Sequence, residues 1–198
     1  VEIKRLTQKD DHLYVAGVFS GNLKVADKST VSKSPYSTFL TKITTSGELL
    51  WMKTFDSSNE TEDLHIDTSN DLEILLGGSF RGEVYIDEIT TYESYDDESD
   101  IFLLCLSTYG GILHHTKFGR SGSNTLSDIS FSQNGSIIVS NVLKVGSEPY
   151  GLALGLNSHL GLEYSISFES SNFSECKNLT VDGANLYLSC NYSQSLRI

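Results

Sequence analysis

The chain has 198 residues, of which 38% are hydrophobic and 20% charged, and its formal net charge is −12 at pH 7. This apolar content is sufficient for a buried core and argues against a disordered chain despite the acidity. The 14 Lys and Arg residues form no cluster that could neutralise several phosphates, so nucleic acid is not an expected partner. No apolar run approaches the roughly 18 residues that a membrane-spanning helix needs, so no membrane span is expected.

The chain begins with two apolar runs, 1–6 and 13–19, separated by a polar turn at 8–11. The second run, LYVAGVF, recurs as ILLGGSF, IIVSNVL and LYLSCNY at 74–80, 137–143 and 186–192. A short alternating run precedes each later copy, at 64–66, 129–131 and 179–181. Alternation with a period of two predicts a pair of β-strands at the start of each unit.

A longer segment, FLTKITTSGELLWMKTF at 39–55, recurs as FLLCLSTYGGILHHTKF at 102–118 and as LALGLNSHLGLEYSISF at 152–168. Each copy is an apolar run, a polar turn with Gly, and a second alternating run ending in Phe, which predicts a β-hairpin. The copies begin 63 and then 50 residues apart, and most of the difference falls in the connection 82–100. Each unit therefore combines two strands with a hairpin.

No unit carries a helical apolar period, which excludes a parallel βαβ architecture and predicts an all-β chain. Four-stranded antiparallel units that repeat in this way are typical of the blades of a β-propeller. The fourteen expected strands make about three and a half blades, at approximately 1–55, 62–118, 126–168 and, incomplete, 176–198. We therefore expect one partial propeller domain, a fragment of a larger propeller whose remainder comes from missing chain or from a second copy.

Several of these segments resemble the SBBP repeat, a β-propeller repeat of bacterial surface and secreted proteins. The resemblance rests on 13–19, 46–51 and 53–55 in the first unit, and on 78–80, 100–102 and 117–118 in the second. In the third unit Leu160 stands where the turn Gly belongs. The segment Gly-Glu-Leu-Leu-Trp also resembles pyrroloquinoline-quinone-type propeller repeats.

The resemblance to the SBBP repeat implies a non-enzymatic binding or scaffold module for a protein or glycan, on a cell surface or secreted. The alternative is a propeller enzyme, a hydrolase or quinone-dependent dehydrogenase, with its site on the propeller axis.

Aligning the three hairpins places Trp51, His114 and Tyr164 in one column. A position that accepts these three residues needs a flat ring to pack on the neighbouring blade and a partner for its polar tip. His114 is therefore interpreted as architectural. The histidines His12, His65 and His159 show no carboxylate or His at ligand spacing, so no catalytic residue is predicted.

The connection 82–100 is the only large departure from the repeat and is rich in carboxylates: Asp87, Glu88, Glu93, Asp96, Asp97, Glu98 and Asp100. Carboxylates gathered on a loop can hold Ca²⁺, which takes six to eight oxygen ligands. The EF-hand order with its central Gly is absent, and a solvated acidic loop is the alternative. This loop is the candidate ligand or calcium surface, and no other cofactor is expected.

The cysteines Cys176 and Cys190 flank an expected hairpin centred near Gly183, which places them opposite each other. Facing cysteines on antiparallel strands approach disulfide distance, so an exported protein is expected to bond them. The alternative is a pair of small buried residues. Cys105 has no context for a nucleophile. Five Asn-x-Ser/Thr triplets, at Asn59, Asn134, Asn172, Asn178 and Asn191, accompany the expected extracellular or cell-surface location.

Overall fold

The computed structural model describes residues 1–69, 73–119, 122–132, 137–145, 148–170, 174–182, 185–192 and 196–197. In these residues the only helical element is a short 3₁₀ turn, η1 (Tyr95–Asp97), and all other regular structure is β-strand. The expected all-β class is therefore confirmed. No helix in the described residues is long and apolar enough to cross a membrane.

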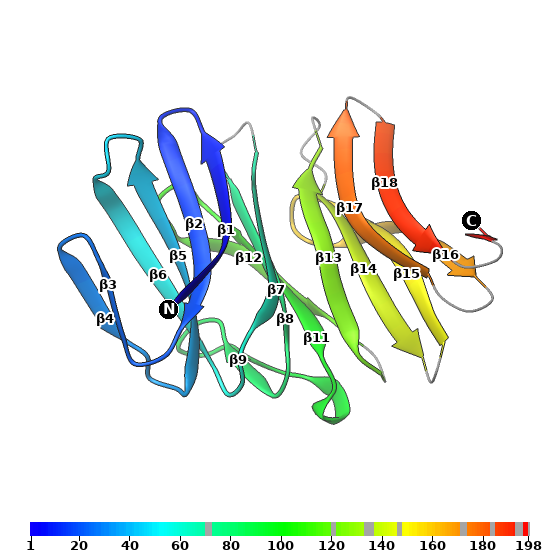
Figure 1. The fold of residues 1–198 in the computed structure, drawn as a ribbon, viewed down its shortest axis with the longest axis horizontal. Helices are drawn as coiled ribbons and strands as arrows, with labels where there is room; N and C mark the ends of the chain where they lie inside the picture. The colour runs from blue at the N-terminus through cyan, green and yellow to red at the C-terminus, as the bar shows by residue number, and fades with distance from the viewer. Residues whose placement is uncertain are drawn as a thin grey trace.

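Three antiparallel four-strand units follow one another along the chain (Figure 1). The first holds β1 (Glu2–Lys9), β2 (His12–Phe19), β5 (Tyr36–Thr44) and β6 (Leu49–Ser57). The second holds β7 (Glu62–Thr68), β8 (Ile74–Phe80), β11 (Asp100–Leu106) and β12 (Ile112–Phe118), and the third holds β13 (Asn124–Phe131), β14 (Ile137–Val145), β15 (Glu148–Leu156) and β16 (Leu162–Ser170). The hairpin β17 (Ser174–Asp182) and β18 (Asn185–Tyr192) comes last, and none of these sheets is closed.

Five short strands were not expected from the sequence: β3 (Asn22–Val25), β4 (Lys28–Val31), β9 (Glu83–Tyr85), β10 (Thr91–Glu93) and β19 (Leu196–Arg197). Along the chain, the hairpins β3–β4 and β9–β10 both lie between the second and third strands of their units, and each follows a Gly with φ of 72°. In space they differ, because β9 pairs with β6 and extends the sheet of the first unit, whereas β3–β4 is a separate sheet. The prediction that 82–100 is the only large departure from the repeat is therefore wrong. The first unit carries an equivalent hairpin, and the third unit instead joins β14 to β15 directly, pairing Val145 with Glu148.

Successive units pack face to face through clusters of buried apolar side chains. We call the side of a unit that meets the next unit its forward face, and the side that meets the previous unit its backward face. Tyr14, Ala16 and Leu40 on the forward face of the first unit pack on Leu76 and Phe102 of the second. Equivalent apolar clusters join the second unit to the third, and the third to β17–β18.

Along one side of the stack the first strands of the units are neighbours, since β1 packs on β7, β7 on β13 and β13 on β17. Each of these strands carries a register shift at the equivalent point, just before Arg5, His65, Asp128 and Asn178. A β-bulge of this kind re-aims the side chains that follow it. The bulge therefore belongs to the repeat.

Leu160 replaces the turn glycine of the first two hairpins without changing the turn. Its φ is 62°, in the same left-handed region as Gly47 at 93° and Gly110 at 79°. A side chain in this region costs about 1–2 kcal/mol. The Leu160 side chain is buried between the second and third units, which offsets that cost.

Candidate functional site

The acidic residues of 82–100 are spread along the hairpin β9–β10, the η1 turn and the start of β11. The Asp87 carboxylate accepts the backbone N–H groups of Ile89 and Thr90, and these hydrogen bonds hold the pKa of Asp87 below its usual value. Glu98 accepts a hydrogen bond from Ser123. In the described residues no three His, Cys, Asp or Glu side chains stand together as a metal-binding group.

Asp100 is the one member of this set that is fully buried. Its carboxylate lies 2.9 Å from the Lys117 ammonium and accepts hydrogen bonds from the Asn124 amide and the Tyr95 backbone N–H, each at 3.2 Å. Lys117 also donates to the backbone carbonyl of Glu93. The carboxylate thus ties the η1 turn and β12 to the beginning of β13. These contacts give Asp100 a structural role.

In the column of Trp51, His114 and Tyr164, the first two residues contact the next unit. Trp51 donates its Nε1–H to the backbone carbonyl of Thr108 at 2.9 Å, in the turn between β11 and β12. The His114 ring lies 4.6 Å, centroid to centroid, from that of His159, in the turn between β15 and β16. Tyr164 is 44% exposed. In the first two units the column residue thus packs on the hairpin turn of the following unit.

Three residues at equivalent positions of the first strands form a polar chain that crosses the units. Arg5 donates to His65 Nε2 at 3.1 Å, and His65 Nδ1 lies 3.1 Å from the Asp128 carboxylate. Asp128 also accepts the backbone N–H of Leu179 at 3.0 Å. The expectation that His65 has no nearby carboxylate is therefore wrong. Arginine is only a donor, so Nε2 must be the acceptor and Nδ1 carries the proton donated to Asp128.

Both ring nitrogens of His65 are therefore hydrogen-bonded, and the residue acts as a clamp in the sense that it links the second unit to the first through Arg5 and to the third through Asp128. Burial raises the pKa of Asp128, but the hydrogen bonds from His65 and from the Leu179 backbone outweigh it, and the pKa lies below its usual value. Sequence spacing hid the contact, because His65 and Asp128 are 63 residues apart. Arg5, His65 and Asp128 share one polar column only when the first strands are aligned by their bulges.

The lowered pKa of Asp128 predicts a loss of stability in acid. A carboxyl group with a depressed folded-state pKa stabilises the fold above its unfolded-state pKa, near 4, and that contribution is lost as the pH falls through the folded-state value. We expect Asp128→Asn to lower the denaturation midpoint at pH 7 and to flatten the decline of stability between pH 5 and pH 3 (about the range set by the unfolded pKa). Urea titrations at several pH values measure both effects. If the free energy of unfolding declined equally steeply with falling pH in both proteins, the lowered pKa of Asp128 would be contradicted.

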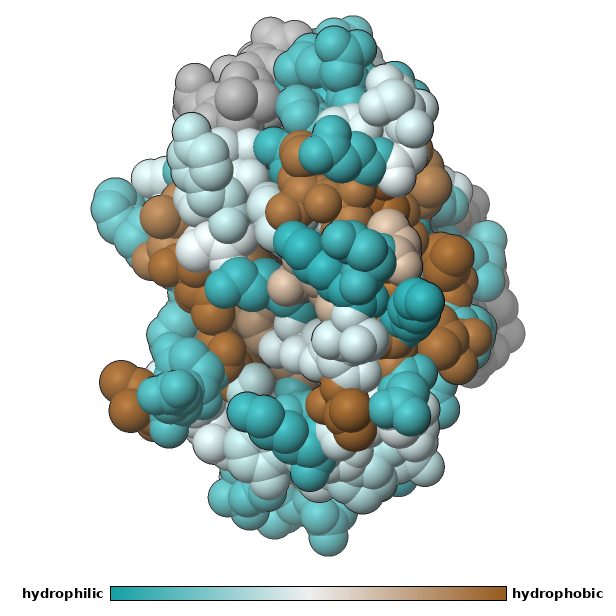
Figure 2. Space-filling model, turned by 90° about the vertical axis from the view of Figure 1, so that its left-hand side faces the viewer, coloured by the Kyte–Doolittle hydropathy of each residue, from teal (hydrophilic) through white to brown (hydrophobic). Residues whose placement is uncertain are grey.

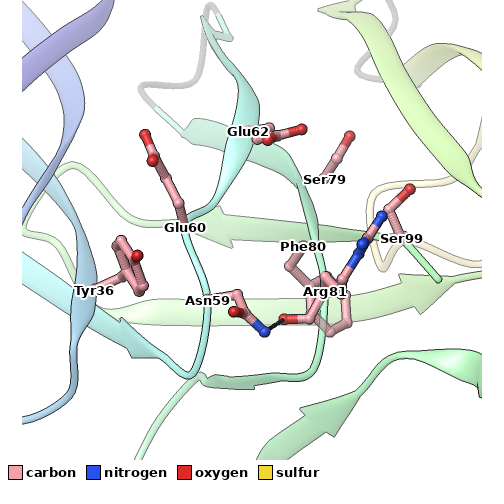
Figure 3. A pocket seen from close by; sticks show the side chains of 8 residues that line it. All are labelled: Tyr36, Asn59, Glu60, Glu62, Ser79, Phe80, Arg81 and Ser99. Carbon is pink, nitrogen blue, oxygen red and sulfur yellow. Dashed lines mark hydrogen bonds between the residues drawn. The ribbon is translucent and has the colours of Figure 1, made fainter. Parts of the chain in front are cut away.

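An open hollow of about 320 Å³ lies beside the start of β7 and the end of β8 (Figure 3). Its lining is mostly polar: Tyr36, Asn59, Glu60, Glu62, Ser79, Phe80, Arg81 and Ser99. Tyr36 stands on one side and Arg81 on the other, extending toward Ser99, while Glu60 and Glu62 lie between them. The Asn59 amide donates a hydrogen bond to the backbone carbonyl of Arg81 at 3.4 Å, which links two of the segments that line the hollow.

Charge in the hollow is mixed. Glu60 lies 3.8 Å from the Lys4 ammonium, which also pairs with Glu2 at 2.8 Å. A neighbouring depression of about 340 Å³ shares Glu60 and Glu62 and is lined by Lys4 and Arg5 as well. Carboxylates, an amide and a guanidinium around an aromatic ring can hydrogen-bond a polar, uncharged ligand from several directions. Apart from Asn59, which heads one of the Asn-x-Ser/Thr triplets, these residues did not stand out in the sequence, because the lining of the hollow comes from four separate segments.

The structure joins Cys176 and Cys190, the pair expected to face each other, in a disulfide between β17 and β18. Cys105 is a buried free thiol, and burial, with a smaller effect from Glu73, raises its pKa to about 12, which removes nucleophilic character. Asn59, Asn178 and Asn191 are exposed. Asn134, Asn172 and Gly183 lie outside the described residues.

No family model matches the chain and no curated protein matches it, so its function is inferred from the geometry of its own residues.

Proposed function

We propose that the chain is part of a β-propeller of the SBBP type and works as a non-enzymatic binding module of a surface-exposed or secreted protein. Support for the propeller comes from the face-to-face stack of equivalent four-strand units with their first strands on one side. Support for an oxidising location comes from the Cys176–Cys190 disulfide, because such bonds persist mainly outside the cytosol.

The ligand that we propose is a carbohydrate, held in the hollow of Figure 3. The observation that carries this proposal is the combination of the exposed Tyr36 ring with the hydrogen-bonding side chains of Asn59, Glu62 and Arg81 around one hollow. A sugar presents an apolar ring face for an aromatic side chain, and hydroxyl pairs for carboxylates, amides and guanidinium groups. The hollow is also open, which suits one end or one face of a longer glycan.

Arg81→Ala and Tyr36→Ala are each expected to weaken glycan binding at least tenfold, which corresponds to about 1.4 kcal/mol or more. Each removes a group that projects over the hollow from an exposed position, so folding is expected to persist. An array of immobilised oligosaccharides would identify the ligand, and calorimetry with the best binder would measure the dissociation constant.

Tyr95→Ala is the matched control, because Tyr95 is also an exposed tyrosine but does not line the hollow. It is expected to bind as the unaltered protein does. Binding that survives Arg81→Ala and Tyr36→Ala would place the ligand elsewhere. A panel of glycans with no binder at all would contradict the carbohydrate proposal.

The second candidate is a propeller hydrolase, favoured by the presence of Glu60 and Glu62 in one hollow. Paired carboxylates supply the acid and base of glycoside hydrolysis. Product analysis of the bound glycan separates the two functions. Release of reducing ends that is abolished by Glu62→Gln would establish the hydrolase, whereas unchanged ligand recovered after long incubation supports the binding module.

A further inference from the structure

Two depressions adjoin along the seam between the first and second units. One is the hollow of Figure 3, and the other, of about 340 Å³, is lined by the start of β1 and by residues of 60–64. Glu60 and Glu62 line both depressions, so the two form one continuous groove. The hollow proposed to hold a sugar therefore continues along the seam, past these two carboxylates.

The groove is mostly polar along its length and carries no formal net charge. Its lining holds three acidic and three basic side chains: Glu60, Glu62, Asp63, Lys4, Arg5 and Arg81. The left-hand side of Figure 1, which Figure 2 shows face on, differs in character, because apolar residues lie at its surface among polar ones. A polar lining with balanced charge favours a ligand that is uncharged and rich in hydroxyl groups.

The basic groups of the second depression already have partners. The Lys4 ammonium lies 2.8 Å from Glu2 and 3.8 Å from Glu60, and Arg5 donates to His65 Nε2 at 3.1 Å. An anionic sugar would have to displace these contacts and would also face the carboxylates of the groove. A neutral sugar can accept hydrogen bonds from the remaining N–H groups of Lys4 and Arg5 while the existing contacts stay in place.

Asp63 lines the second depression and not the first, and its backbone conformation is unusual. It lies in the bulge of β7, where its φ is 48°, in the left-handed region. In the described residues, the bulges of the other first strands, β1, β13 and β17, contain no residue in this region. The conformation is strained for a residue with a side chain, although aspartate tolerates it better than most. The bulge of β7 thus places an exposed carboxylate at the second depression.

From these observations we propose that the groove binds a neutral, linear oligosaccharide of at least two sugar residues. One sugar lies against Tyr36 and Arg81, and a following sugar is hydrogen-bonded by Asp63. Since the first sugar occupies the hollow of Figure 3, this inference rests on the proposed function. The second depression adds hydrogen bonds that a single sugar does not make, so the affinity rises with the length of the oligosaccharide.

The experiment compares Asp63→Gly with the unaltered protein on neutral single sugars, dimers and trimers of glucose, mannose and N-acetylglucosamine. Glycine adopts a positive φ without strain, so the variant loses the carboxylate while the bulge persists. Titrations followed by NMR measure the dissociation constants. For the series that binds best, the unaltered protein is expected to bind the trimer at least about tenfold more tightly than the single sugar. In Asp63→Gly this ratio is expected to fall to about threefold or less.

Asp10→Gly is the matched control, because Asp10 is also an exposed aspartate, with φ of 51°, and lines neither depression. It is expected to keep the full ratio between trimer and single sugar. Asp63→Asn is expected to keep part of the ratio, because its amide still hydrogen-bonds hydroxyl groups. Circular dichroism checks that the variants are folded, and the comparison of lengths on the unaltered protein needs no variant.

The outcomes separate this inference from the proposed function. Equal affinity of the unaltered protein for single sugars and trimers would overturn the second subsite and leave the first in place. A full ratio in Asp63→Gly would remove Asp63 from the site. A uronic acid trimer that binds as tightly as its neutral counterpart would contradict the assignment to neutral sugars. If no sugar of any length bound, the carbohydrate site and its extension would both be wrong.

Discussion

Replacing Asp100 with alanine is expected to lower the free energy of unfolding by about 3 kcal/mol, the lower end of the range for breaking a buried ion pair. The Asp100 side chain is fully buried, and its loss removes the anionic partner of the Lys117 ammonium and one acceptor each of the Asn124 amide and the Tyr95 backbone N–H. The Lys117 side chain is 31% exposed, so water compensates part of its loss. Urea denaturation at neutral pH measures the change.

Two further variants make this expectation specific. Asp100→Asn keeps the shape and some acceptor capacity but loses the charge facing Lys117, so an intermediate loss is expected. Glu88→Ala removes an exposed carboxylate from the same loop, where surface substitutions usually change stability by less than about 0.5 kcal/mol. Equal losses for Asp100→Ala and Glu88→Ala would show that the acidic residues act only through their summed charge.

Asp100 also explains why the acidic loop looked like a ligand surface in the sequence. Carboxylate spacing alone does not distinguish a buried side chain with three partners from an exposed one. The distinction arises from Lys117 and Asn124, which are 17 and 24 residues away along the chain. The spacing of neighbouring residues in the sequence carries no information about such distant partners. The structural carboxylate of Asp100 was therefore grouped with the solvated carboxylates of 82–100.

The strands and hairpins could be predicted where the local sequence signals, alternating apolar runs and Gly turns, are strong. Apolar runs joined by Gly turns give β5–β6 and β11–β12, and alignment of the repeats predicts the flat-ring column of Trp51 and His114. Even Leu160 follows the repeat, because the surrounding strands hold its backbone in the left-handed region. Repetition supplies information that no single hairpin contains.

The elements that were missed have weak or shifted patterns. The strands β3 and β4 have four residues each, NLKV and KSTV, which is too short for alternation to be recognised. The β-bulges shifted the register of the first strands, so alternation placed Leu64 beside Ile129, whereas the pairing register places Ile66 there. That shift concealed the column of Arg5, His65 and Asp128, and with it the clamp between units.

The remaining large effect is expected at the Cys176–Cys190 disulfide. Its two cysteines are 14 residues apart, and closing a loop of this length restricts the unfolded chain by about 3 kcal/mol. The hairpin β17–β18 has only two strands, and an isolated two-stranded hairpin is marginally stable in water. Its packing on the third unit through Ala153 and Phe168 therefore depends on the bond that keeps Cys176 in place.

Cys176→Ser together with Cys190→Ser is expected to increase hydrogen exchange first in 174–192 and to lower the thermal midpoint of this part of the stack. Reduction of the unaltered protein provides the matched control, because it breaks the same bond without changing the side-chain volume. The double substitution and the reduction are expected to give the same increase in hydrogen exchange and the same fall in the thermal midpoint. Cys105 stays buried and does not react with thiol reagents until the protein unfolds, so any labelling before unfolding reports on Cys176 and Cys190. Free thiols at both positions in non-reducing peptide mapping would contradict the expectation.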